Sequence, residues 1–379
     1  MAFFVSMEPF KNVFNRDAIS MMGWVLAARR ADFSAKKFTR LACRDLEALE
    51  LKQRSSQIFQ ALDECLPPCF EKAAALIIES LHPSCDANSS GEGVTEEGIQ
   101  GWLIMPLAEY TGQRGHGHFL LAMDLFQQLT MRFTAEFAIR HMILAHPEKT
   151  LATLMDWTSH DNHHVRRLVS EGSRPRLPWA MQLPQVIAYP QLTLPLLEAL
   201  RDDPSEYVRR SVANHLNDIA KDHPQMILDL ATAWHKNAPP ERVRLLRHAM
   251  RNLLKQGHEK ALKLHGISAP KLADVSLEIP SSQVPFHGDL RFSLQMRSTA
   301  KRDQKIRIDL IVHYQKANGK LAPKTYLWKE FILSAAAVHR AERTQSFRAI
   351  TTRVYHRGLH RLEVRANGVA LAIADFHLI

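Results

Sequence analysis

The first 271 residues carry apolar positions at the spacing of α-helices. Asn15 is a predicted N-cap, and behind it Ile19, Met22 and Leu26 recur at i, i+3 and i+7, so that they share one helix face. Ser34 opens a second run of the same kind. The spacing continues through residues 38–46, 56–66 and 70–81. A loop rich in serine, glycine and acidic residues, 82–98, then separates this N-terminal part from the helices that follow.

Three segments between residues 163 and 246 resemble one another. Val165 of the first copy and Val208 of the second are 43 residues apart, and Val243 of a weaker third copy follows 35 residues later. A turn marked by aspartate or proline precedes each copy: 161–162, 203–204 and 239–240. Paired helices at this period are typical of HEAT-like repeats, which stack into a solenoid. A helical bundle without repeats is the alternative.

Near residue 272 the pattern changes to the alternation of apolar and polar positions that is typical of strands. The predicted strands are 275–277, 292–296, 306–312, 326–333, 346–351, 358–364 and 369–378. Asn318-Gly319 and Asn367-Gly368 supply turn signals between them. We therefore predict a mainly α protein, with a HEAT-like helical-repeat solenoid over residues 1–271 and an immunoglobulin-like β-sandwich over residues 272–379. The Cys–Trp–Cys signature of antibody domains is missing, so only the architecture is implied.

Composition places the chain among soluble globular proteins. It has 379 residues, of which 46% are hydrophobic and 23% are charged. It contains no apolar run of about 18 residues or more, and no basic segment precedes the apolar N-terminus, so we expect no membrane association and a cytoplasmic location. The four cysteines lack the paired CxxC spacing of a zinc site, and we expect reduced thiols.

The formal net charge of +10 favours a polyanionic partner. This charge is unevenly distributed: residues 272–379 hold 17 Lys and Arg against 9 Asp and Glu, a net of +8. Residues 272–379 are therefore the part of the chain that we expect to attract phosphate groups more strongly.

Common catalytic signatures are missing from the sequence: it has no HExxH, no G-x-S-x-G, no P-loop and no dinucleotide fingerprint. His160, His163 and His164 cluster in a loop-to-helix segment. A metal site would need more ligands, so a solvated helix start is the favoured interpretation, and we expect no metal and no cofactor.

Three acidic residues in the helical part are candidates for chemistry instead. Glu136 has a structural alternative, an i,i+4 pair with Arg140. Glu171 lies at a helix end before Gly172, a predicted C-cap, where the helix dipole disfavours a carboxylate by roughly 0.3–1 kcal/mol. Asp218 lies on the polar side of its helix, and hydrogen bonding between repeats is the alternative there.

Arginines surround these acids in the sequence: Arg166, Arg167, Arg174, Arg176, Arg209 and Arg210. Singly they would be solvated helix residues, but six beside the repeat turns indicate phosphate contacts, because guanidinium groups match phosphate oxygens. Trp179 lies in a connection rich in proline and arginine, where it is a candidate aromatic wall. Core packing is the ordinary alternative for a tryptophan.

Four segments of the chain resemble AlkC-type DNA alkylation-repair glycosylases: 9–15, 133–140, 164–179 and 203–218. The run from Val165 to Trp179, VRRLVSEGSRPRLPW, is the most specific of them. The resemblance covers the whole helical part, and the tail is similar in architecture to the immunoglobulin-like domain that some members carry.

This resemblance implies hydrolysis of the N-glycosidic bond of cationic alkylated bases, chiefly 3-methyladenine and 3-methylcytosine, in double-stranded DNA, without base flipping into a deep pocket. It also implies that Glu136, Glu171 and Asp218 form the acidic cluster, with Trp179 beside the deoxyribose. We expect a monomer that needs no cofactor. The alternative that basic charge and repeats leave open is a HEAT scaffold that binds nucleic acid or protein without catalysis.

Overall fold

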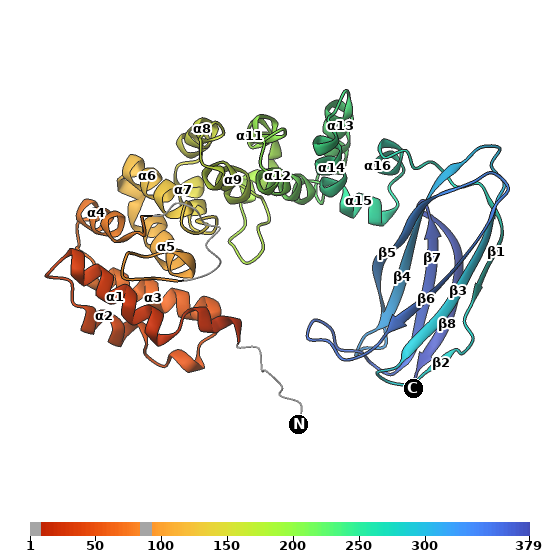
Figure 1. The fold of residues 1–379 in the computed structure, drawn as a ribbon, viewed down its shortest axis with the longest axis horizontal. Helices are drawn as coiled ribbons and strands as arrows, with labels where there is room; N and C mark the ends of the chain where they lie inside the picture. The colour runs from red at the N-terminus through yellow and green to blue at the C-terminus, as the bar shows by residue number, and fades with distance from the viewer. Residues whose placement is uncertain (1–8, 84–92) are drawn as a thin grey trace. The chain divides into compact units, whose positions relative to one another are not determined.

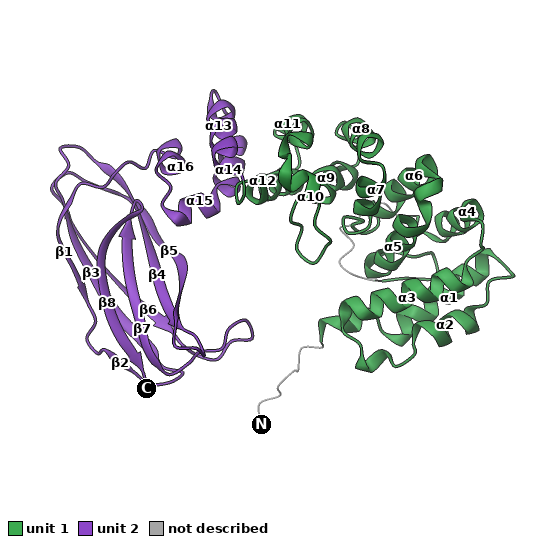
Figure 2. Ribbon diagram, turned by 180° about the vertical axis from the view of Figure 1, so that it is seen from behind, with its two compact units in different colours: residues 1–222 green, residues 223–379 purple. Residues whose placement is uncertain are grey.

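The computed structural model describes residues 9–83 and 93–379, so most of the predicted 82–98 loop lies outside the described residues. The chain forms two compact units, residues 1–222 and residues 223–379, which are coloured separately in Figure 2. We describe each unit on its own. None of the helices in the described ranges is long and apolar enough to cross a membrane.

The first unit consists of helices, most of which are labelled in Figure 1; α10 is labelled in Figure 2. Its α-helices are α1 (Arg16–Arg29), α2 (Ala35–Ala42), α3 (Leu51–Cys65), α4 (Phe70–Ser80), α5 (Ile104–Arg114), α6 (Phe119–Thr130), α7 (Ile139–Ala145), α8 (Pro147–Trp157), α9 (His163–Gly172), α10 (Pro184–Ala188), α11 (Leu194–Leu200) and α12 (Glu206–Ile219). Short 3-10 turns occur at η1 (Phe10–Val13), η2 (Leu46–Ala48), η3 (Gly101–Leu103), η4 (Gly115–Gly117) and η5 (Pro190–Leu192).

Two helix starts predicted from the sequence are confirmed. The Asn15 side chain accepts a hydrogen bond from the Ala18 amide at 2.8 Å at the start of α1. The Ser34 hydroxyl accepts from the Lys37 amide at 3.2 Å at the start of α2. Each side chain satisfies one of the free amides of a first helical turn, which is why these residue types mark helix beginnings.

The copies of the sequence repeat occupy equivalent helices. The first copy forms α9, which packs against α8, and the second forms α12, which packs against α11. Helices α9 and α12 also pack against each other, with Val165 and Val208 fully buried. The sequence repeat therefore corresponds to two helical pairs, α8–α9 and α11–α12, that stack on each other as in HEAT-like repeats.

The second unit begins with helices and continues as two sheets. Its helices are α13 (Pro224–His235), α14 (Pro240–Ala249), α15 (Arg251–Gln256) and α16 (Glu259–Leu264). Its strands are β1 (Leu272–Glu278), β2 (Gln283–Val284), β3 (Asp289–Ser298), β4 (Gln304–Gln315), β5 (Leu321–Leu333), β6 (Val338–Ser346), β7 (Gly358–Ala366) and β8 (Val369–Leu378). One sheet has the order β1-β3-β6 and the other β2-β8-β7-β4-β5, with β2–β8 parallel and the remaining pairs antiparallel.

The two sheets share one apolar core, which confirms the sandwich. Phe292 from β3, Leu310 from β4, Val364 from β7 and Phe376 from β8 lie buried in it. The predicted turn at Asn367-Gly368 is a two-residue hairpin with φ of 49° and 83°, the positive values that a type I′ turn needs.

The predicted strand at 346–351 is wrong. Residues 347–357 form the connection between β6 and β7, and Phe347 at its start is buried in the sandwich core. The strand that does precede it, β6, was missed because its sequence lacks apolar alternation: exposed and half-buried positions alternate along it. Backbone pairing with β3 holds it in the sheet instead.

The change from helices to strands falls between Leu264 and Leu272, close to the predicted boundary at 271/272. The compact units, however, divide at 222/223, so α13–α16 belong with the sheets. Arg247 on α14, for example, forms an ion pair with Glu330 on β5. The functional division into 1–271 and 272–379 stays a prediction.

Candidate functional site: an acidic cluster between repeats

The three predicted acids meet in the first unit although they come from separate segments. Glu136 lies in the turn before α7, Glu171 lies near the end of α9, and Asp218 lies in the last turn of α12. Two arginines link them in a chain of alternating charge. Arg167 pairs with Glu136 and lies 3.6 Å from Glu171 Oε1, while Arg174 donates to Glu171 Oε1 at 2.6 Å and to Asp218 Oδ2 at 2.8 Å.

Further donors fix each carboxylate. The Thr134 hydroxyl donates to Glu136 Oε2 at 2.6 Å, and the Ser211 hydroxyl donates to Glu171 Oε2 at 2.7 Å. Lys221 Nζ, one turn beyond Asp218, donates to Asp218 Oδ1 at 2.8 Å. Each of the three carboxylates thus accepts hydrogen bonds from at least two side chains. These bonds hold the carboxylates in fixed positions.

The cluster is buried and balanced in charge. Glu136, Glu171 and Asp218 are all buried, and their three charges are matched by those of Arg167, Arg174 and Lys221. Burial by itself would raise the pKa of Glu171, but the nearby guanidinium groups and the Ser211 hydroxyl hold that pKa below its ordinary value. Glu171 is therefore ionised at neutral pH.

The predicted alternative for Glu136, a helical pair with Arg140, is not found. Arg140 instead donates to three backbone carbonyls at the end of α9 and in the segment that follows it, at 2.9 Å to Gly172, 2.7 Å to Arg174 and 2.8 Å to Met181. Burial, followed by the charge of Arg174, lowers the pKa of Arg140 to about 10. Through these hydrogen bonds Arg140 holds in position the segment that carries Arg174 and Trp179.

Glu171 lies at the C-terminal end of α9 as predicted, but Gly172 is not the C-cap. It is the last helical residue, and Ser173 occupies the cap position. A Cβ at Gly172 would lie 2.6 Å from Ile139 Cγ2, so close packing between helices requires this glycine. Arg174 supplies the positive charge that the helix end itself does not.

Trp179 is not a core residue. Its side chain is 65% exposed, and its backbone has a φ of 67°, in the left-handed region that bulky residues rarely adopt. Lys52 Nζ on α3 donates to the Trp179 carbonyl oxygen at 2.6 Å. An exposed aromatic ring is thus held in a strained position beside the segment that carries Arg174.

The predicted phosphate-binding arginines fall into two groups. Arg167 and Arg174 are mostly buried and belong to the acidic cluster. Arg166 is also largely buried and forms a two-bond pair with Asp203, at 2.6 and 3.0 Å.

The other predicted arginines lie in different settings. Arg209 donates to the carbonyls of Asp203 and Pro204. Arg176 pairs with Asp222 at 2.9 Å. Arg210 pairs with Glu206 in the preceding turn of α12, and both side chains are exposed. Arg210 is therefore the member of the set that is most open to a polyanion.

The histidines lie at a helix start, as the sequence indicates. Helix α9 begins at His163, and Asn162 caps it by accepting from the His164 amide at 2.8 Å. The His160 Nδ1 atom accepts from the Asn162 amide at 3.0 Å. Within residues 9–83 and 93–379, no group of three His, Cys, Asp or Glu side chains is arranged to hold a metal ion.

Sequence reasoning missed several residues that shape the site. Lys52 and Arg140 act on backbone carbonyls far along the chain, for which no local pattern exists. Two other residues could have been found from the sequence repeat. Ser211 donates to Glu171, and the ring centroid of Tyr207 lies 5.1 Å from the Arg167 guanidinium. They belong to α12, which the repeat placed beside α9, so their facing positions could have been inferred.

Comparisons with known proteins show which family has this fold. The chain is 33% identical over 374 residues to an uncharacterised protein, YhaZ of Bacillus subtilis, covering 98% of this chain and all of that one. It also matches the structure of Pseudomonas fluorescens alkylpurine DNA glycosylase AlkC bound to DNA containing an abasic site analog, with 34% identity and a TM-score of 0.87 over 97% of this chain and 99% of that one. This chain is a member of the AlkC family. The family model of the C-terminal Ig-like domain of YhaZ also matches residues 273–379, so the AlkC-type architecture extends through the sandwich.

Proposed function

We propose that this AlkC-family chain is a DNA glycosylase that hydrolyses the N-glycosidic bond of cationic alkylated bases such as 3-methyladenine and 3-methylcytosine. The observation that carries the proposal is the meeting of Glu136, Glu171 and Asp218 in one cluster, in a chain that aligns along 97% of its length with an alkylpurine DNA glycosylase.

The chemistry fits a substrate that is already charged. When the glycosidic bond breaks, its electron pair neutralises the cationic base, so no general acid is needed at the leaving group. Positive charge then develops on the deoxyribose, and fixed carboxylates stabilise such a charge in a site of low dielectric. Water attacks the sugar carbon, and a carboxylate accepts the water proton or orients the attack.

We assign the exposed face of Trp179 to the deoxyribose. An aromatic ring attracts a positive charge over its face, which adds to the effect of the carboxylates. Because the ring is exposed at 65%, it reaches a duplex without extrusion of the base into a deep pocket.

Arg167 and Arg174 have a different role from phosphate binding in this proposal. They keep Glu171 ionised while DNA is absent, because two guanidinium groups offset the cost of burying the carboxylate. Exposed cations, among them Arg210 and those of residues 272–379, are assigned to the phosphates of double-stranded DNA. The protein acts as a monomer in this scheme.

The test is release of free methylated base from DNA treated with a methylating agent, together with the appearance of abasic sites. We expect both, and we expect full activity in EDTA, because the cationic base leaves without a Lewis acid. Binding of the same DNA without release of base would instead favour a non-catalytic scaffold.

A further inference from the structure

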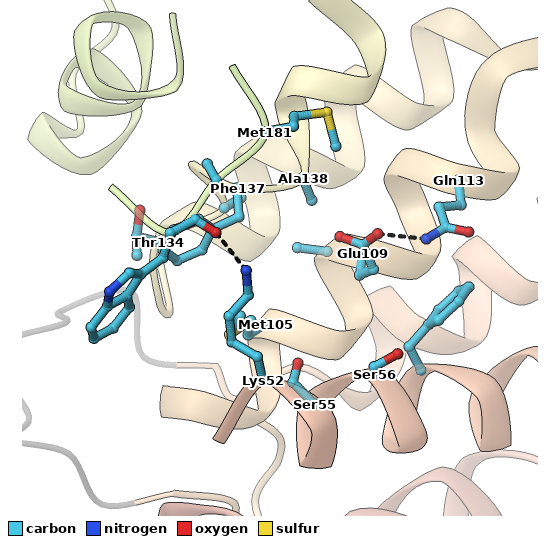
Figure 3. A pocket seen from close by; sticks show the side chains of 15 residues that line it. Lys52, Ser55, Ser56, Met105, Glu109, Gln113, Thr134, Phe137, Ala138 and Met181 are labelled. Carbon is cyan, nitrogen blue, oxygen red and sulfur yellow. Dashed lines mark hydrogen bonds between the residues drawn. The ribbon is translucent and has the colours of Figure 1, made fainter. Parts of the chain in front are cut away.

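A cavity of about 230 Å³ lies beside Trp179, wholly within the first unit (Figure 3). We call it the Trp179 pocket. Four segments line it: α3, α5, the turn that carries Glu136, and residues 179–181. In its wall Lys52 Nζ donates to the Trp179 carbonyl oxygen at 2.6 Å, and a dashed line marks this hydrogen bond of Lys52 in Figure 3.

The size and walls of the pocket suit a single flat ring system. Its larger apolar lining residues are Phe59, Met105, Phe137 and Met181. An apolar cavity of about 150 Å³ holds benzene, whereas drug-sized ligands fill about 300 Å³ or more. The pocket therefore has room for a fused bicycle such as a purine and is too small for a nucleotide.

One carboxylate faces this apolar space. Glu109 on α5 accepts a hydrogen bond from Gln113 Nε2 at 2.5 Å, and its Oε1 atom lies 3.0 Å from His141 Nε2. Both contacts use Oε1, which leaves the Oε2 atom of this pocket-lining carboxylate as a further hydrogen-bond acceptor. An exocyclic amino group of a nucleobase is a donor of the matching kind. Ser56 and Thr134 add hydroxyls to the lining.

The pocket adjoins the acidic cluster through shared residues. Thr134 lines the pocket and also donates to Glu136 at 2.6 Å, and Trp179 lines the pocket as well. A base that leaves its sugar at the cluster would thus meet this cavity.

We propose that the Trp179 pocket binds the free alkylated base after its release from DNA. The faces of the base lie between Phe59, Phe137 and the two methionines, and its amino group donates to Glu109. Occupancy delays rebinding of the base at the sugar and makes the free base an inhibitor of turnover. This inference rests on the proposed function, because the identity of the base comes from it.

Direct binding provides the test. We would measure equilibrium dialysis of the full chain with 3-methyladenine and expect a dissociation constant in the millimolar range or tighter, given about a dozen ligand atoms. Ser56→Phe places a ring in the pocket, and Glu109→Gln removes the charge of the acceptor. We expect each to weaken binding by about tenfold or more.

Gln60→Phe is the matched control. It introduces the same side chain at another exposed position of α3, outside the pocket lining, and should bind the base as the wild type does. Thermal melting checks that each variant is folded, and Glu109→Gln still decides the question if Ser56→Phe does not fold.

The outcomes separate the two proposals. No binding to the wild type at about 10 mM base, or equal binding to all variants, overturns the pocket assignment. Release of base from methylated DNA is measured separately on the same preparations. Excision without dialysis binding refutes the pocket alone, whereas absence of excision refutes the proposed function.

Discussion

Both compact units bury charged side chains, and they do so in different ways. In the sandwich, Arg307 and Asp309 on β4 form two hydrogen bonds of 2.7 Å, and on β7 Glu363 pairs with Arg365. The partners are two residues apart on one strand, so they lie on the same face of the sheet by local geometry. Such pairs need no function to explain them.

Local geometry explains the acidic cluster of the repeats only in part. Glu171 pairs with Arg167 and Arg174, and Asp218 pairs with Lys221, within four residues of sequence, but the acids themselves come from distant segments. Glu136 and Glu171 are 35 residues apart, and Asp218 follows 47 residues later. An exposed and strained Trp179 lies in the connected segment. Breaking a buried pair costs stability in either unit, typically about 3–5 kcal/mol, so burial alone cannot identify a catalytic carboxylate. The comparison teaches that the setting of a buried charge, more than burial itself, indicates chemistry.

The largest effect is expected for the cluster acids. Asp218→Asn and Glu171→Gln keep shape and hydrogen-bonding capacity but remove charge, so each should lower single-turnover excision by about tenfold to a thousandfold, or about 1.4–4 kcal/mol of barrier. Each should also lose affinity for DNA that carries a cationic sugar mimic, relative to a neutral abasic analogue.

Asp309→Asn is the control for this prediction. It breaks a buried arginine pair of similar geometry in the sandwich and should lower the melting temperature, with normal excision per folded molecule. Normal excision by both cluster variants would remove the catalytic assignment and place the cluster with the structural pairs.

Trp179→Gly should separate activity from stability. Glycine adopts a φ of 67° readily, so the free energy of unfolding should stay the same or rise by up to about 1 kcal/mol. Loss of the aromatic face should lower excision by about tenfold. Tyr189→Ala removes another exposed aromatic ring of the first unit and should leave both quantities unchanged. A drop in stability without a drop in excision would make Trp179 structural.

Removal of residues 272–379 tests whether this positively charged segment contributes to DNA binding. A chain that ends at Lys271 lacks +8 of the +10 net charge, so its affinity for duplex DNA should fall and depend less steeply on salt. Fluorescence anisotropy at several salt concentrations measures both. Unchanged affinity would assign the sandwich another role.

The same truncation also tests the boundary between the units. Without Glu330, the helices α13–α16 lose the sheet side of their compact unit, and we expect limited proteolysis to remove them while residues 1–222 survive. Equal protection of residues 1–222 and 223–271 would favour the sequence-based boundary.

The smallest effect is expected for single arginines. Arg210→Gln, at an exposed site, should weaken binding to damaged and undamaged duplexes equally and flatten the salt slope by roughly one unit. Its effect on stability should stay within about 0.5 kcal/mol, whereas Arg166→Gln breaks the pair with Asp203 and should lower the melting temperature. A lesion-selective loss for Arg210→Gln would indicate base readout instead.

The sequence by itself determined the kinds of element and much of their order. Apolar spacing and the caps at Asn15 and Ser34 predicted helices, and alternation with Asn367-Gly368 predicted a hairpin of the sandwich. The repeat predicted that α9 and α12 are equivalent, which places Glu171 near Ser211. These features depend on neighbours within a few residues or on a fixed period, and both are visible in the chain.

Only the tertiary structure decided how the acids are paired and how Trp179 is presented. Arg140 and Lys52 reach carbonyls 41 and 127 residues away, and β6 is a strand because β3 lies beside it. Such contacts follow from which segments pack together, and no local pattern of residues encodes them. The same holds for Glu136. Arg140, its expected partner four residues later, donates to the backbone of another segment, and Glu136 pairs with Arg167 instead. A buried charge bonds the partner that packing brings near it, because desolvation makes any unpaired arrangement too costly.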